Sequence, residues 1–79
     1  MSKRTRQLKK EIDDLEREIE ALEQKRERSQ IAVMRAMISG GKPSKEDEQY
    51  FFAFSQLIDN DRDALRKLYA ELDQLTRKI

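Results

Sequence analysis

The chain has 79 residues, enough for one small domain, and 42% of them are charged against 37% hydrophobic. The net charge is only +1, so no overall field draws the chain to nucleic acid or to an anionic membrane. Cysteine and histidine are both absent, which excludes disulfides and removes the usual zinc ligands and the commonest general base. We therefore expect no enzyme activity, no cofactor, no metal, no membrane span and a cytoplasmic protein.

The first predicted element is a long helix from about residue 3 to residue 39. Apolar residues recur along it at steps of three and four, the heptad spacing that holds one seam of a helix against a partner helix. This seam consists of Leu8, Ile12, Leu15, Ile19, Leu22, Arg26, Ser29, Val33 and Ala36.

A turn is predicted at residues 40–44. Gly40 and Gly41 can adopt the left-handed conformation that closes a helix at its C-terminus. Pro43 prevents the first helix from continuing, and Ser44 is a good N-cap for a second one.

The second predicted helix runs from about residue 45 to residue 78. Its seam consists of Asp47, Phe51, Phe54, Ile58, Asp61, Leu65, Leu68, Leu72, Leu75 and Ile79. When the two seams are paired antiparallel they stay in register, from Leu8 opposite Leu75 to Ala36 opposite Asp47. The pattern predicts an all-α fold in which residues 1–79 form a single antiparallel two-helix hairpin, a coiled coil expected to assemble into a helical bundle. The alternation of Ile and Leu in the first seam also suits a parallel two-stranded coiled coil, which remains the alternative.

Polar residues are predicted to support this arrangement. Arg26 and Asp61 lie one seam layer apart, so we expect a diagonal pair that sets the register at some cost in stability. On the exposed faces, pairs at i, i+4 are expected for Asp13 with Arg17, Asp63 with Lys67 and Asp73 with Arg77.

Surplus apolar residues near the turn are the strongest functional signal. Residues 31–38 are all apolar except Arg35, and the aromatic run at 50–54 faces several directions. We name the off-seam members the loop-proximal patch: Ile31, Met34, Met37, Ile38, Tyr50, Phe52 and Leu57. Such surfaces usually mark an interaction site. Self-association into a four-helix bundle, binding of a different helical protein, and tolerated exposure are the three interpretations.

A basic cluster is predicted at the open end of the hairpin. Its members are Lys3, Arg4, Arg6, Lys9, Lys10, Arg77 and Lys78, with no acid before Glu11 in the first helix. The cluster is either a solvated end or a contact for RNA or DNA phosphates. The shape is similar to that of the Rop family, small hairpins that dimerise and bind RNA, although no residue match supports the likeness.

Two short matches resemble enzymes. Residues 55–59, Ser-Gln-Leu-Ile-Asp, are similar to the Ser-Gln-x-x-Asp signature of the short helical-hairpin aspartyl-phosphate phosphatases, which implies Asp59 as a catalytic acid. The spacing of Leu8, Ile12 and Arg26 resembles the first helix of all-helical chorismate mutases, where the Arg binds a substrate carboxylate. The first helix is longer than the phosphatases need and the third mutase helix is missing.

The predicted elements are, in order, an amphipathic helix, a turn at Gly40-Gly41 and an aromatic start of the second helix at Tyr50. This order resembles that of the small two-helix co-chaperones of type III secretion needle subunits. We therefore predict a non-enzymatic protein-protein interaction module of the self-associating or adaptor/co-chaperone type, with no small-molecule substrate. The alternative is a small dimeric nucleic-acid-binding hairpin that uses the basic open end.

Overall fold

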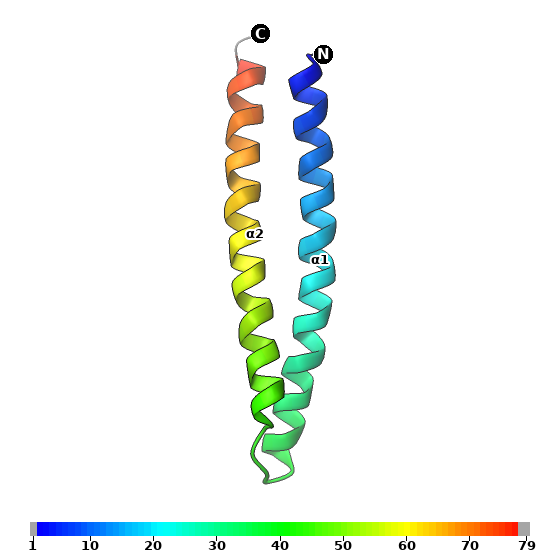
Figure 1. Cartoon of the computed structure of the whole chain (residues 1–79), viewed down its shortest axis with the longest axis vertical. Coiled ribbons are helices and arrows are strands. Elements are labelled where there is room, and N and C mark those ends of the chain that lie inside the picture. Colours follow the sequence, from blue (N-terminus) through cyan, green and yellow to red (C-terminus); the bar gives the residue numbers. More distant parts are fainter. Residues whose placement is uncertain (1, 78–79) are drawn as a thin grey trace.

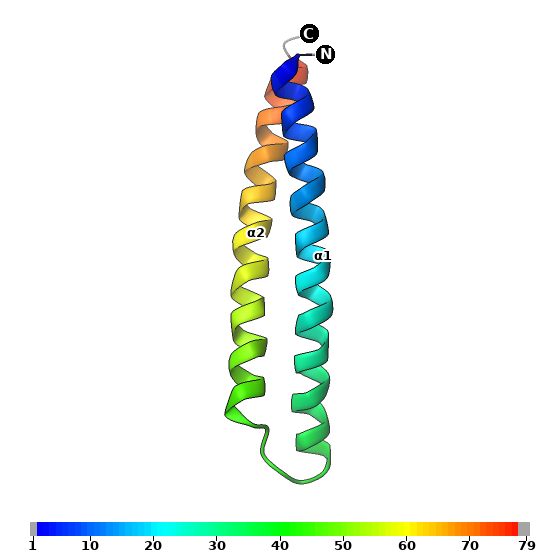
Figure 2. The ribbon, with the colours of Figure 1, turned by 45° about the vertical axis from the view of Figure 1, so that its right-hand side comes forward.

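The computed structural model describes residues 2–77, which fold into two antiparallel helices, α1 (Lys3–Ile38) and α2 (Lys45–Arg77). The start of α1 and the end of α2 lie at one end of the hairpin, and the loop lies at the other (Figures 1 and 2). The all-α antiparallel hairpin is thus confirmed, and the parallel arrangement of the first helix is not the one adopted. Neither helix, over the described residues, has an apolar stretch that could span a bilayer.

The start of α1 is fixed by a serine cap. The Ser2 hydroxyl oxygen accepts a hydrogen bond from the backbone N–H of Thr5 at 3.1 Å, and the Ser2 carbonyl accepts from the N–H of Arg6 at 3.3 Å. These bonds satisfy donors that the first helical turn leaves without partners.

The end of α1 is a Schellman motif. Gly40 has φ +82°, the left-handed region, and its N–H donates to the Met37 carbonyl at 3.1 Å. The N–H of Gly41 donates to the Ala36 carbonyl at 3.0 Å. These two bonds define the motif, and they make Ser39 the C-cap. The helix therefore ends at Ile38, one residue before the predicted end.

The start of α2 follows the prediction. The Ser44 hydroxyl oxygen accepts from the N–H of Asp47 at 3.1 Å, and the Ser44 carbonyl accepts from the N–H of Glu48 at 3.2 Å. Glu46, Asp47 and Glu48 place negative charge in the first turn, where the helix dipole favours it. The predicted end at Lys78 and the seam residue Ile79 lie outside the described residues.

The core is the seam, and its burial is greatest away from the loop. Leu8 and Ile58 are fully buried, at 0% exposure, and Ile12 and Ile19 are nearly so. The other described seam residues are half-buried, except that Phe51 near the loop is 36% exposed. Each helix has only one neighbour, so the seam is open to solvent along both edges and most exposed where the aromatic residues lie.

The polar layer differs from the prediction. Within residues 2–77, no ion pair joins Arg26 to Asp61, and one Asp61 carboxylate oxygen is buried without a hydrogen-bond partner. Glu18 of α1, and not Arg26, is the charged side chain that interacts with Asp61. The long side chain of Arg26 can place its guanidinium in the solvent at the edge of the seam. Arg26 therefore does not need an acidic partner inside the seam.

The pairs along each helix are partly as predicted. Arg77 and Asp73 form an ion pair at 3.0 Å. Asp63 pairs with Arg66 at 3.3 Å, three residues away, in place of Lys67. No ion pair joins Asp13 and Arg17 in the described part of the chain. These differences follow from the similar reach of i+3 and i+4 partners on a helix.

Neighbouring residues of α2 test the assigned seam. Ile58→Ala should lower the free energy of unfolding by about 2–5 kcal/mol, because it removes a fully buried side chain. Leu57→Ala, at a position that is 47% exposed, should cost under about 1 kcal/mol in dilute protein. Urea unfolding followed by circular dichroism measures both. Equal losses would show that the buried stripe of α2 is rotated from the one described.

Candidate interaction surfaces

Two surfaces flank the seam, and they can be defined by position. We call the residues that directly precede seam residues the groove face, and those that directly follow them the bridged face. Because the helices are right-handed and antiparallel, the preceding positions of both helices lie on one side of the hairpin and the following positions lie on the other. Side-chain contacts across the seam agree with this assignment on both faces.

The bridged face carries bonds between the side chains of the two helices. The Tyr69 hydroxyl donates a hydrogen bond to the Glu16 carboxylate, and Arg62 forms an ion pair with Glu23 at 2.9 Å. The hydrogen bond to Glu16, desolvation and the nearby carboxylates raise the pKa of the Tyr69 hydroxyl. Four polar side chains of this face are therefore bonded across the seam within the molecule.

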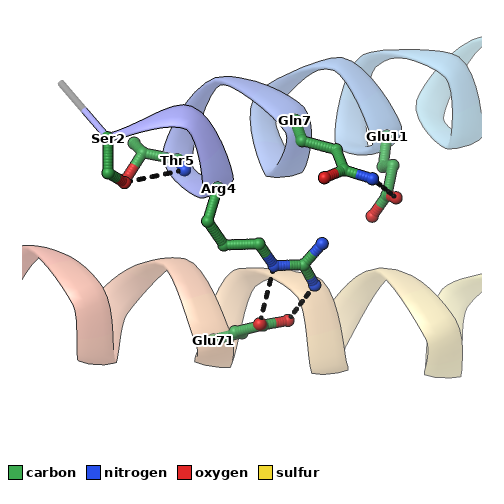
Figure 3. A network of polar contacts seen from close by, with 6 residues as sticks. All are labelled: Ser2, Arg4, Thr5, Gln7, Glu11 and Glu71. Atoms are coloured by element: carbon green, nitrogen blue, oxygen red, sulfur yellow. Dashed lines mark hydrogen bonds and ion pairs between the residues drawn. The ribbon is translucent and has the colours of Figure 1, made fainter.

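Thr5 is buried and continues the seam by one step, so Arg4 before it lies at the open end of the groove face, where it reaches from α1 to Glu71 on α2 (Figure 3). The guanidinium donates two hydrogen bonds to the carboxylate, at 3.0 and 2.8 Å. Bonding to Arg4 lowers the pKa of Glu71, and bonding to Glu71 raises the pKa of Arg4. Gln7 donates a weak bond at 3.4 Å to Glu11 one turn further along α1.

The predicted basic end is therefore less basic than α1 alone suggests. Arg4 is paired with Glu71 and Arg77 with Asp73, so two of the predicted cations have acidic partners. Lys9 also has an interaction partner. The sequence of the first helix has no acid before Glu11, and the carboxylate beside Arg4 comes from the other helix at Glu71, a residue distant in the sequence. Lys3, Arg6 and Lys10 are exposed, and Lys78 lies outside the described residues.

Two open grooves follow the groove face. The acidic groove, of ≈ 390 Å³, is lined by Glu11, Asp14, Leu15, Glu18 and Leu68. The basic groove, of ≈ 240 Å³, is lined by Lys25, Arg28, Ser29, Tyr50 and Phe54. The Tyr50 and Phe54 rings stack with their centroids 6.1 Å apart, which gives the basic groove an aromatic wall. The two grooves thus carry opposite charge, one in each half of the molecule.

Two carboxyl groups, those of Glu18 and Asp61, interact at the loop-side end of the acidic groove. A hydrogen bond to Asp61, repulsion from that carboxylate and desolvation together raise the pKa of Glu18. Two carboxyl groups that approach this closely destabilise the hairpin when both are ionised. The sequence did not indicate this pair, because Glu18 lies beside its seam and not in it.

The loop-proximal patch is exposed throughout. Ile38 is 81% exposed, Phe52 64% and Met37 63%, and the other four members are 41% to 51% exposed. The structure does not gather these residues on one face. Tyr50 and Leu57 lie on the groove face, whereas Met34, Met37 and Phe52 follow seam residues and lie on the bridged face. Ile31 and Ile38 lie on the outer side of α1, so the patch surrounds the loop half of the hairpin.

The residues of the two enzyme resemblances and the groups of possible metal ligands can also be placed in the structure. Among residues 2–77, no group of three or more acidic, Cys or His side chains could hold a metal ion. Asp59 is exposed on α2, and Arg26 is half-buried in the seam. Comparison with known proteins found no match, neither to a protein-family model nor to a curated protein or a solved structure. The functional interpretation therefore depends on the surfaces of this chain.

The carboxyl groups predict opposite responses to pH. The raised folded-state pKa of Glu18 gives a stabilisation that is present below the ordinary carboxyl pKa and lost as the pH rises through the folded value. The lowered pKa of Glu71 gives a stabilisation that is present above the ordinary value and lost as the pH falls through the folded value. Glu18→Gln should thus raise the Tm at neutral pH, and Glu71→Gln should lower it.

The difference in Tm between each variant and the wild type should become smaller near about pH 4, where the wild-type carboxyl groups begin to protonate. Thermal unfolding of dilute protein at the two pH values measures them. A Glu18→Gln variant that is less stable than the wild type at neutral pH would contradict the described pair.

Proposed function

We propose that this chain is a non-enzymatic helical-hairpin module for protein-protein association in the cytoplasm, and that it binds through the loop-proximal patch. The observation that carries the proposal is where large apolar side chains are exposed. Among the described residues, all of them except Tyr69 lie between residues 31 and 57. Tyr69 is the exception in the open half, and its hydroxyl is bonded to Glu16.

The energetics favour covering this patch. Burial of one large apolar side chain contributes about 1.5–3 kcal/mol, so a few members of the patch are enough to sustain a complex. A two-helix hairpin has no further layer of its own to cover them. Met34 and Met37 suit such an interface because the thioether side chain adapts to irregular surfaces.

Self-association into a homodimeric four-helix bundle is the form of association that we propose first, since it would supply the missing layer. An adaptor or co-chaperone role with a helical partner protein is the second form. It draws on the resemblance to the type III secretion co-chaperones at Gly40-Gly41 and Tyr50, and it uses the same patch.

The nucleic-acid alternative has less support. Arg4 and Arg77 are engaged by carboxylates, which reduces the charge that the open end offers to phosphate. Lys3, Arg6 and Lys10 remain exposed there, without an aromatic residue beside them for base stacking. We therefore do not adopt this function.

A charged double variant tests the proposal. Met34→Glu with Leu57→Glu places a carboxylate on each side of the loop half while leaving every seam residue unchanged. Self-association measured by sedimentation equilibrium should weaken by more than about tenfold, since two apolar contacts are lost. The helical circular dichroism signal should stay at the wild-type level.

The matched control is Gln30→Glu with Gln56→Glu, which adds the same charge to the same half at exposed polar positions. This control should associate like the wild type. Wild-type association of the Met34→Glu/Leu57→Glu variant would overturn the assignment of the patch.

A further inference from the structure

The charges of the groove face on α1 change sign at one residue. The face runs through Glu11, Asp14 and Glu18, then Ala21, then Lys25 and Arg28. Steps of three and four keep all six on one stripe of the helix. Acids therefore precede Ala21, and bases follow it. A second stripe laid antiparallel over this one, centred on Ala21, would place Asp14 opposite Arg28 and Glu18 near Lys25, whereas Glu11 would face the uncharged Ala32.

We propose that a second copy of this chain packs antiparallel on the groove face, with its acidic groove over the basic groove of the first copy. A two-fold axis passes near Ala21, so Asp14 of each copy faces Arg28 of the other, and Glu18 faces Lys25. Such an interface is isologous, because the same surface contributes both sides. This proposal rests on the proposed function, specifies the partner and its orientation, and uses the two patch residues that lie on the groove face, Tyr50 and Leu57.

These charges do not neutralise one another within one chain. Asp14 and Arg28 are separated by roughly 21 Å along α1, at 1.5 Å per residue. Within residues 2–77, neither of them, nor Lys25, takes part in an ion pair. On the bridged face, by contrast, Glu16 and Glu23 already have partners on α2. Asp14, Lys25 and Arg28 of the groove face thus remain available to a partner chain.

The α2 side of the groove face is compatible with the same arrangement. In the basic half it contributes Tyr50 and Leu57, which the open half of the second copy would cover. In the acidic half it contributes Lys67, and also Glu71, which is already engaged by Arg4. Near the axis it carries Ala64, a small residue like Ala21, so the two hairpins can approach closely.

The parallel arrangement of two copies is less favourable. With the loops at the same end, α1 of one copy would lie over α2 of the other. The basic residues Lys25 and Arg28 would then meet uncharged residues such as Leu57, and their charges would stay uncompensated. Charge complementarity therefore selects the antiparallel orientation.

A charge exchange between chains tests the orientation. Asp14→Arg places two cations opposite each other at both symmetric sites, and Arg28→Asp places two acids there. Each variant alone should self-associate about tenfold or more weakly than the wild type. An equimolar mixture should recover dimers, because the arginine introduced at position 14 of one chain then faces the aspartate introduced at position 28 of the other. Native mass spectrometry identifies the mixed dimer by its mass.

Matched controls use the same substitutions at exposed positions off the groove face. Asp13→Arg and Arg17→Asp carry the same changes of net charge as the two test variants. Each control alone should associate like the wild type, and mixing should bring no gain. Any attraction that arises only from net charge would appear equally in the control mixture.

A mixture of Asp14→Arg and Arg28→Asp chains that fails to form dimers, while the wild type does, would overturn the antiparallel pairing. The proposed function would survive that result if Met34→Glu with Leu57→Glu still abolished association. A wild-type chain that stays monomeric at all concentrations would overturn the second copy as the partner. The module would then have to bind a different protein.

Discussion

Every feature of this molecule depends on the fact that each helix has one neighbour and no more. Only one stripe of α1 and one of α2 can be buried, and the fully buried residues, Leu8 and Ile58, belong to these stripes. The antiparallel register then decides which off-seam residues lie near each other. Because a hairpin has two edges, the same register produces a groove face and a bridged face along its whole length.

The two halves of the hairpin use these faces differently. In the open half, ion pairs and hydrogen bonds between the helices, such as Arg4 with Glu71, hold the edges of the seam. In the loop half, apolar side chains occupy the equivalent positions and stay exposed. We propose that the exposed apolar residues of the loop half form the binding surface, while buried seam residues such as Leu8 and Ile58 stabilise the hairpin in both halves. In the dimer that we propose, the charged grooves would connect the two halves, because the acidic half of one copy would face the basic half of the other.

Local patterns in the sequence predicted most of the fold. The heptad spacing identified the seam. Gly40 and Ser44 identified the two ends of the turn, because a helix cap is formed with backbone groups only a few residues away in the sequence. The cap at Ser2 was not predicted, although a serine before a helical pattern is a usable signal. Helix ends therefore follow from local chemistry to within a residue.

Contacts between side chains of different helices were harder to predict. Glu16 with Tyr69 and Glu18 with Asp61 lie beside the seam, where several partners are within reach of a long side chain. The choice among them depends on rotamers and on the separation of the helices, which the spacing of residues does not encode. The patch residues were identified by type, but their distribution around the loop half required the register in three dimensions.

The most direct test of the central claim, that the seam forms within one chain, is a crosslink between Glu16→Cys and Tyr69→Cys with a short bismaleimide. The chain has no cysteine of its own, so these two thiols are the ones that react. Light and heavy isotope-labelled chains are mixed before crosslinking, and the linked peptides are read by mass spectrometry. The account predicts linked peptides of one isotope only. A second pair, Glu16→Cys with Arg62→Cys, should crosslink in poorer yield, because position 62 lies two helical turns before position 69 in α2. Mixed-isotope peptides as the main product would contradict the intramolecular hairpin.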